Sequence, residues 1–193
     1  MELKDLGKGF PGGGFAAGKQ DHTDSAADET AAESVAFPDE ESKKATEKAM
    51  NLLLHKDRTE HELVSRLERA EFSSEAIGFA VDYVRRYGYI NDLRYATGYI
   101  GLHQASMSRR QIQQKLRERG ISGEVLSEAF SACASDGEEG TDPEEEALQS
   151  VLSKRLRGRS VSELTYEEKQ KEMRYLAGKG FPADRIRRVF LDG

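Results

Sequence analysis

The sequence holds a single cysteine, Cys133, among 193 residues, and it has no tryptophan. One cysteine excludes an intramolecular disulfide framework and fits a reducing compartment. The preceding residues Phe130, Ser131 and Ala132 supply neither a base nor a positive charge that would activate a thiolate. We therefore interpret Cys133 as a small core residue and not as a nucleophile.

Long apolar stretches are missing as well. No run approaches the roughly 18 apolar residues that a membrane-spanning helix needs, and the N-terminus lacks the charged-then-apolar pattern of a secretory signal. Only 37% of the residues are hydrophobic whereas 33% are charged, so the cores must be small or part of the chain must lack one. We expect a cytoplasmic protein with no membrane contact.

The net charge of −6 conceals a segregation of charge. Residues 1–41 carry 3 basic and 10 acidic side chains, and residues 134–146 carry 7 acidic side chains and no basic one. The rest of the chain holds 26 of the 29 basic and 18 of the 35 acidic side chains. Acidic blocks of this kind mark interaction tails, and basic modules can meet phosphate backbones. One hypothesis is that the acidic segments shield the basic part of the chain.

Residues 1–42 form a Gly- and Ala-rich acidic segment with few large apolar side chains. It cannot bury enough surface to offset its ordering entropy, so we predict a disordered tail. Residues 13–19 fit the first seven positions of a phosphate-binding loop, but Gln20 stands where Ser or Thr would hold magnesium. Because no strand precedes this segment and no amphipathic helix follows it, we reject nucleotide binding.

From Ser42 onward, apolar residues recur at helical spacings. Thr59, Ser108 and Thr165 each begin a capping-box pattern, completed three residues later by Glu62, Gln111 and Glu168. Apolar residues lie 4, 8 and 13 positions after Thr59 and again after Ser108; the third copy is looser. The core positions that we predict are Ala45, Ala49, Leu52, Leu53, Leu63, Leu67, Ile77, Ala80, Val81, Val84, Leu93, Ala96, Tyr99, Ile100, Ile112, Leu116, Leu126, Ala147, Leu148, Val151, Leu152, Met173, Leu176, Ile186, Val189 and Phe190.

This internal repetition predicts an all-α fold of three tandem three-helix repeats that form an elongated, curved body. We place the first repeat at 43–87, the second at 88–134 and the third at 147–193, with an acidic linker at 135–146 and the disordered N-terminal tail before them. No stretch shows the alternation typical of a strand.

Two features resemble the RecX family. The segment Gly88–Ala96, which reads GYINDLRYA, is similar to the aromatic and acidic signature between the family's first and second units. The turns at 119–122 and 179–182 are similar to the family's turns. The resemblance covers roughly Ser42–Leu191; the acidic tail and the insert Ser135–Glu146 depart from the family pattern. It implies a regulator that binds the RecA recombinase, lies along the filament groove and limits its ATPase and strand-exchange activity in recombination, DNA repair and the SOS response.

Enzyme chemistry finds little support in the sequence. The four histidines form no metal-ligand pattern, and the pair His61-Glu62 opens like a zinc-protease motif whose second ligand position is occupied by Ser65. We expect no catalytic residue, no metal, no cofactor and no enzymatic activity.

Clustered basic side chains are the candidates for contact with a partner or with DNA. The alternative for any one of them is a solvated helix face, but their clustering favours a joint role. The candidates are Arg85, Arg86, Arg94, Arg109, Arg110, Lys115, Arg155, Arg157, Arg185 and Arg188. The partners that we expect are the RecA filament and the single- or double-stranded DNA within it, bound by a monomer.

Two other functions remain open. Three-helix units resemble helix-turn-helix domains, so the chain could be an autonomous DNA-binding module; a generic helical scaffold is the third interpretation. Five tyrosines between 83 and 99 interleave with arginines and could stack on bases, although rings buried at a helix corner explain them better. Asn91 or Asp92 is predicted to cap the fourth helix.

Overall fold

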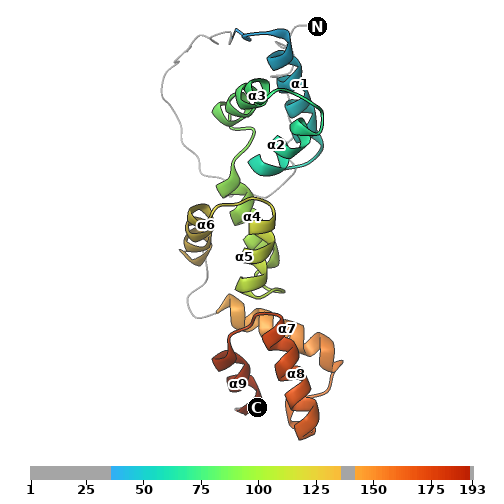
Figure 1. The fold of residues 1–193 in the computed structure, drawn as a ribbon. Coiled ribbons are helices and arrows are strands. Elements are labelled where there is room, and N and C mark those ends of the chain that lie inside the picture. The colour runs from blue at the N-terminus through green and yellow to red at the C-terminus, as the bar shows by residue number, and fades with distance from the viewer. Residues whose placement is uncertain (1–35, 136–141, 192–193) are drawn as a thin grey trace. The chain divides into compact units, whose positions relative to one another are not determined.

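The computed structural model describes residues 36–135 and 142–191, and these residues form nine α-helices, one short 3-10 helix and no strand (Figure 1). The first repeat contains α1 (Glu40–His55), α2 (Glu60–Glu68) and α3 (Ser74–Arg86), and the second contains α4 (Asp92–His103), α5 (Arg109–Glu118) and α6 (Gly123–Ser135). The third contains α7 (Pro143–Leu156), a 3-10 helix (Val161–Glu163), α8 (Tyr166–Gly178) and α9 (Ala183–Leu191). The predicted all-α fold of three tandem three-helix repeats is confirmed for these residues.

Some sequence interpretations fall outside the described ranges. They are the disordered state of residues 1–35, the loop-like segment at 13–19 and most of the acidic linker. At the borders, α1 begins at Glu40, and α7 takes in Pro143–Glu146, which the sequence interpretation placed in the linker. Asp142 caps α7 by accepting a hydrogen bond from the Glu144 amide at 3.0 Å, and the acidic first turn suits the positive end of the helix dipole.

Each repeat has its own hydrophobic core. Leu63, Leu67 and Val84 are fully buried in the first, Ile112 and Leu116 in the second, and Leu148 and Leu176 in the third. Most of the predicted core positions are buried; those that pack only partly buried against the cores are Leu52, Leu53, Leu93, Tyr99, Val151, Met173 and Val189.

The first helix departs in part from the predicted stripe. Met50, Thr46 and Ser42 are buried although they are not among the predicted core positions, and Leu54, which follows the predicted stripe, is 44% exposed. The buried Thr46 hydroxyl donates to the Ser42 carbonyl at 2.8 Å, which satisfies it inside the helix. The 3-10 helix and its Ser160–Glu163 capping box were not predicted.

The three predicted capping residues all begin a helix. Thr59, Ser108 and Thr165 accept hydrogen bonds from the amides three residues later, at 3.2, 3.2 and 3.3 Å. The reciprocal half of the box forms only at Thr165, whose amide donates to Glu168 at 2.9 Å. At Thr59 and Ser108 the predicted full box is wrong: only the hydroxyl half forms, and these hydroxyls have a second partner in the next repeat.

That second partner belongs to what we call the first joint, between repeats 1 and 2. The Thr59 hydroxyl donates to the Arg119 carbonyl at 2.6 Å, and the Glu60 amide donates to the Asp92 carboxylate at 2.9 Å. Gly120, with a φ of +83°, lies so close that an added Cβ would come within 2.2 Å of the His61 Cβ. Only glycine fits both this conformation and this approach.

The second joint, between repeats 2 and 3, has the same chemistry. The Ser108 hydroxyl donates to the Lys179 carbonyl at 2.6 Å, and the Arg109 amide donates to the Glu144 carboxylate at 3.2 Å. An added Cβ at Gly180, whose φ is +85°, would lie 3.0 Å from the Arg110 Cβ. Each joint therefore has two groups from one repeat, which are the hydroxyl of the capping residue and the backbone amide of the residue after it. The next repeat contributes three groups: a turn carbonyl, a glycine and a carboxylate.

Candidate interaction surfaces

Four of the ten predicted contact residues form ion pairs within their own repeat. Arg85 of α3 contacts Glu60 at 2.7 Å and Asp82 at 2.8 Å, and Arg155 of α7 contacts Glu172 of α8 at 2.5 Å. From α9, Arg185 pairs with Asp142 and Arg188 lies 3.8 Å from Glu145. These side chains tie helices together, so a contact with a partner would have to compete with the pairs.

Ion pairing also shifts carboxylate titration in the third repeat. A hydrogen bond from Arg159 is the main cause that lowers the pKa of Glu168 to about 2, assisted by the Thr165 amide. The Arg155 guanidinium lowers the pKa of Glu172 in the same way. Arg155 also stacks over the Tyr175 ring at 3.7 Å, which further fixes its position.

The other six predicted residues are exposed and form no ion pair within the described part of the chain: Arg86, Arg94, Arg109, Arg110, Lys115 and Arg157. Arg94 reaches only the Gly88 carbonyl, at 3.5 Å, and Arg109 lies 4.3 Å from the centre of the Phe130 ring. Arg157 ends α7 in the left-handed conformation, with a φ of 51°. These six retain a guanidinium or ammonium group that an anion could bind.

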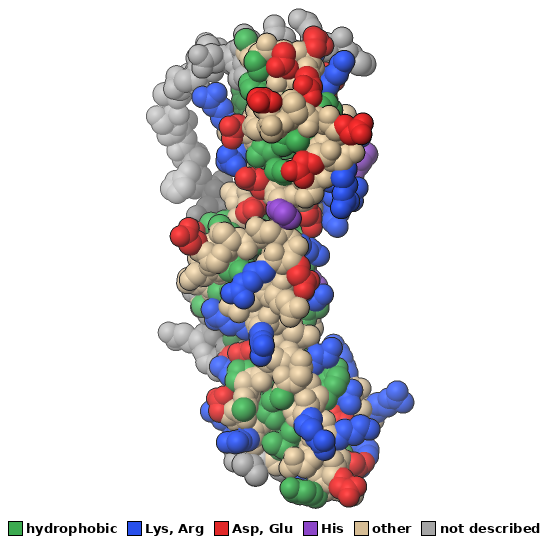
Figure 2. Space-filling model, in the orientation of Figure 1, with side chains coloured by type: hydrophobic (Ala, Val, Ile, Leu, Met, Phe, Trp, Pro, Cys, Tyr) green, Lys and Arg blue, Asp and Glu red, His purple; other side chains and the backbone are tan. Residues whose placement is uncertain are grey.

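Three of these six candidates, Arg109, Arg110 and Lys115, lie on α5, whose sequence RRQIQQKLRE has four basic residues and one acidic residue. Its exposed residues include Arg110, Gln114 and Arg117, which share one face because they are four and seven residues apart. The one acidic residue, Glu118, accepts a hydrogen bond from Gln114 at 3.0 Å. We call Arg110, Gln114 and Arg117 the α5 face. Figure 2 shows Lys and Arg side chains over all three repeats on the side in view, mixed with many Asp and Glu side chains over the first.

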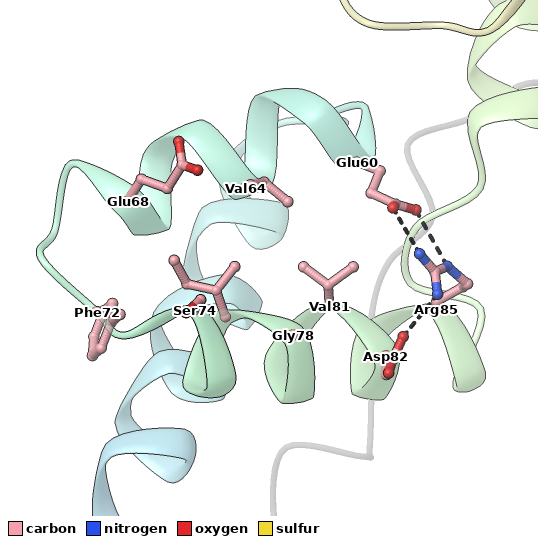
Figure 3. A pocket seen from close by; sticks show the side chains of 10 residues that line it. Glu60, Val64, Glu68, Phe72, Ser74, Gly78, Val81, Asp82 and Arg85 are labelled. Atoms are coloured by element: carbon pink, nitrogen blue, oxygen red, sulfur yellow. Dashed lines mark hydrogen bonds and ion pairs between the residues drawn. The ribbon is translucent and has the colours of Figure 1, made fainter.

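The first repeat carries a groove between α2 and α3 of about 580 Å³ (Figure 3). Val64, Val81 and Phe72 line it with apolar surface, and no atom lies within 4 Å of where a Cβ would stand on Gly78. Its charged rim consists of Glu60, Glu68 and Asp82, together with Arg85, which Figure 3 shows held by Glu60 and Asp82. The rim is therefore net acidic.

The corresponding positions of the second repeat carry the opposite charge. A shift of 49 residues, which takes Thr59 to Ser108, takes Glu60 to Arg109 and Glu68 to Arg117. The same scaffold thus offers carboxylates on α2 and guanidinium groups on α5. The first arrangement suits a cationic partner surface and the second suits phosphates.

Four of the five tyrosines of residues 83–99 are partly buried, whereas Tyr87 is 47% exposed. Phe37 stacks on Tyr83 with ring centres 5.9 Å apart, and Tyr87 lies 4.7 Å from Tyr83. Arg119 lies over the Tyr99 ring at 4.8 Å and donates to the Tyr95 hydroxyl. Burial raises the pKa of both Tyr83 and Tyr95. For the four partly buried rings, these contacts match the interpretation that they fill a helix corner.

Asp92 has a role that the sequence did not reveal. Asn91 is the cap of α4, accepting from the Arg94 amide at 2.9 Å, while Asp92 accepts from Glu60 in the first joint. Burial raises the pKa of Asp92, and the bond from Glu60 opposes that shift. The partner is 32 residues away, so no local pattern could have identified it.

Residues 36–135 and 142–191 contain no group of three or more His, Cys, Asp or Glu side chains that could hold a metal ion. Cys133 is half-buried against the second core, and its thiol lies 3.7 Å from the Thr97 carbonyl. None of the helices described is both long and apolar enough to span a membrane.

The fold and its joints define an all-α protein of tandem three-helix domains. Family comparison matches the first three-helix domain of RecX at residues 45–83, the second at 91–129 and the third at 143–190. The chain belongs to the RecX family.

Individual relatives agree with this assignment. "Regulatory protein RecX" of Caldanaerobacter subterraneus subsp. tengcongensis is 30% identical over 77% of this chain and 70% of its own length. The protein of the same name from Vibrio vulnificus is 31% identical over 75% of this chain and 89% of its own. The crystal structure of RecX from Lactobacillus salivarius has a TM-score of 0.65 at 21% identity, covering 79% of this chain and 96% of that one, and so supports the fold. This is a family of regulatory proteins.

Proposed function

We propose that this chain binds the RecA recombinase filament and inhibits its ATPase and strand exchange during recombination, DNA repair and the SOS response. It acts as a cytoplasmic monomer, without a cofactor and without being an enzyme. The observation that carries the proposal is the match to all three RecX domains in order, among relatives named as regulatory proteins.

Surfaces of opposite charge support a partner that contains both protein and DNA. The α5 face offers Arg110 and Arg117 to phosphates, whereas the groove of the first repeat offers Glu60, Glu68 and Asp82 to a basic protein surface. A filament of recombinase on DNA presents both phosphates and a protein surface to one ligand. An isolated duplex presents phosphates but no protein surface.

The test is the single-stranded-DNA-dependent ATPase of RecA, titrated with substoichiometric amounts of this protein. The proposal expects a steep fall in rate at concentrations where no binding to bare DNA is detectable. An unchanged rate would overturn it.

A pair of matched variants then tests the exposed charges of α5. Lys115→Glu with Arg117→Glu reverses two exposed charges of α5 that have no internal ion pair in the described ranges, and it leaves Arg110, which packs against Gly180 in the second joint, unchanged. Inhibition is expected to need several times more protein. The control is Lys44→Glu with Lys48→Glu, two exposed lysines on one face of α1, which should inhibit as the unmodified chain does. Equal behaviour of the two double variants would count against these charges of α5.

The second candidate is an autonomous DNA-binding module, which the Arg- and Gln-rich α5 face favours, because these side chains pair with guanine and adenine edges. This function requires binding to duplex DNA with sequence preference and without RecA. Replacing an arginine that binds a phosphate should reduce the slope of log affinity against log salt by about 0.9. Inhibition of RecA without such duplex binding would exclude it.

A further inference from the structure

The start of α8 in the third repeat has the same construction as the starts of α2 and α5. Thr165 caps the helix as Thr59 and Ser108 do. Thr59 and Ser108 are completely buried by the next repeat, but Thr165 is exposed and Tyr166 is 77% exposed. The third repeat therefore has the capping half of a joint at the start of α8. Among the residues that the structure describes, no turn of a following repeat packs against it.

The other half of a joint is the turn between the second and third helices of a repeat. In all three repeats the amide after this turn donates to a carbonyl five residues earlier: Phe72 to Leu67 at 3.5 Å, Ile121 to Leu116 at 3.1 Å and Phe181 to Leu176 at 3.2 Å. The residue before it has a positive φ in each case, 63°, 83° and 85°. The first repeat thus has the backbone turn that a joint needs, with no described repeat before it.

The first repeat also has carboxylates where the joints use them. Asp92 and Glu144 lie in the first turns of α4 and α7, and Glu40, with a side chain 78% exposed, lies in the first turn of α1. The backbone and the acid are therefore in place at the N-terminal end of the array.

One position differs. The residue of positive φ is Gly120 or Gly180 in the occupied joints but Glu71 in the first repeat. A Cβ at the Gly120 position would lie only 2.2 Å from the opposing side chain, so the Cβ of Glu71 would obstruct a joint of this geometry. That opposing side chain, two residues after the cap, is His61 or Arg110 in the joints and Glu167 in the third repeat. A contact between two copies would bring two carboxylates together.

We infer that the first and third repeats carry complementary halves of a fourth joint, into which a second copy would dock head to tail, and that Glu71 and Glu167 keep it from forming. Such a contact is heterologous and does not close on itself, so without this block it would produce open chains of molecules. The occupant follows from continuity with the two joints inside the chain, which use the same backbone and capping groups. Terminal repeats of tandem arrays commonly differ from internal ones in this way.

The test is a gain of association. Glu71→Gly restores the residue of the internal joints, and Glu167→Arg restores the arginine of the second. The double variant is expected to show a mass that rises with concentration in sedimentation velocity and exceeds that of a dimer, while the unmodified chain stays at one mass. Circular dichroism establishes that each variant is folded.

The control is Glu71→Ala with Glu167→Arg, which removes the same charge but keeps a Cβ. It should remain at the mass of the unmodified chain. Adding Thr165→Val to the associating variant removes the hydroxyl donor and should weaken association severalfold. The inference is overturned if the Gly variant does not associate, if the Ala variant associates as strongly, or if the loss of the Thr165 hydroxyl changes nothing.

Discussion

Glu71 and Arg157 are the non-glycine residues of positive φ in the described ranges, at 63° and 51°. A side chain in this region is strained by about 1–2 kcal/mol, because its Cβ approaches the following carbonyl oxygen. Glu71→Gly relieves that strain but adds freedom to the unfolded chain, so we expect a net gain of about 0.5–1 kcal/mol in the free energy of unfolding. Urea denaturation at a concentration too low for association measures it.

A glycine placed in a helix should have the opposite effect. Glu75 is exposed in the first turn of α3, and Glu75→Gly should lower the free energy of unfolding by about 0.5–1 kcal/mol. Equal losses from both substitutions would contradict the strain at Glu71.

The Arg159 hydrogen bond, assisted by the Thr165 amide, lowers the pKa of Glu168 to about 2 from an ordinary 4.5. Because the folded chain favours the ionised form, Glu168 stabilises the fold above pH 4.5, and this contribution disappears as the pH falls toward 2. Arg159→Ala should return the pKa toward its ordinary value, since the Arg159 hydrogen bond is the main cause of the shift. Carboxyl-carbon NMR titration measures it; an unchanged pKa in the variant would refute the assignment.

At the scale of helices, the same cap has different consequences in the middle and at the end of the array. Thr59→Ala removes the cap of α2 and also strands the Arg119 carbonyl in the first joint, so we expect a loss of about 2–3 kcal/mol in the free energy of unfolding. Thr165→Ala removes a cap alone and should cost about 1 kcal/mol. Chemical denaturation of the two variants compares them, and equal losses would mean that the joint bond contributes nothing.

Helices and caps were predictable because their determinants are local. The spacing of Leu63 and Leu67 marks a buried face, and Thr59 three residues before Glu62 marks a start. The 3-10 helix escaped prediction because three residues are too few to show a period. The bond from Thr59 to Arg119 spans 60 residues and the bond from Ser108 to Lys179 spans 71, so only the folded chain could reveal them.

The candidate contact residues show the same limit. Their charge is evident from the residue type, but nothing local to Arg85 and Arg155 indicates that Glu60 and Glu172 hold them. Whether a cation is free depends on which carboxylate the fold places beside it. Arg110 and Arg117 could be grouped on one face from spacing alone, because that geometry belongs to a single helix.

At the scale of the whole molecule, three small cores are coupled through two joints, so stability should spread from repeat to repeat. Gly120→Ala would place a Cβ 2.2 Å from the His61 Cβ in a conformation unfavourable to alanine, costing about 2–4 kcal/mol. We expect amide hydrogen exchange to accelerate in α1, α2 and α3 as well as in α5, because the first joint opens. Acceleration confined to the second repeat would contradict the coupling.

Gly101→Ala is the matched control for that prediction. Gly101 lies inside α4 with no atom within 4 Å of an added Cβ, so alanine should slow exchange slightly through its higher helix propensity. The contrast separates the effect of the joint from that of replacing a glycine.

Glu60 and Arg109 each serve two purposes with different atoms. Their backbone amides hold the joints, at 2.9 Å to Asp92 and 3.2 Å to Glu144, while their side chains contact Arg85 and Phe130. Since an amide is the same for every residue except proline, assembly places almost no restriction on the side chain there. The same three-helix unit can therefore recur along the chain with side chains of opposite charge at this position. Neighbouring repeats can then bind partners of opposite charge while the backbone hydrogen bonds of the joints stay the same.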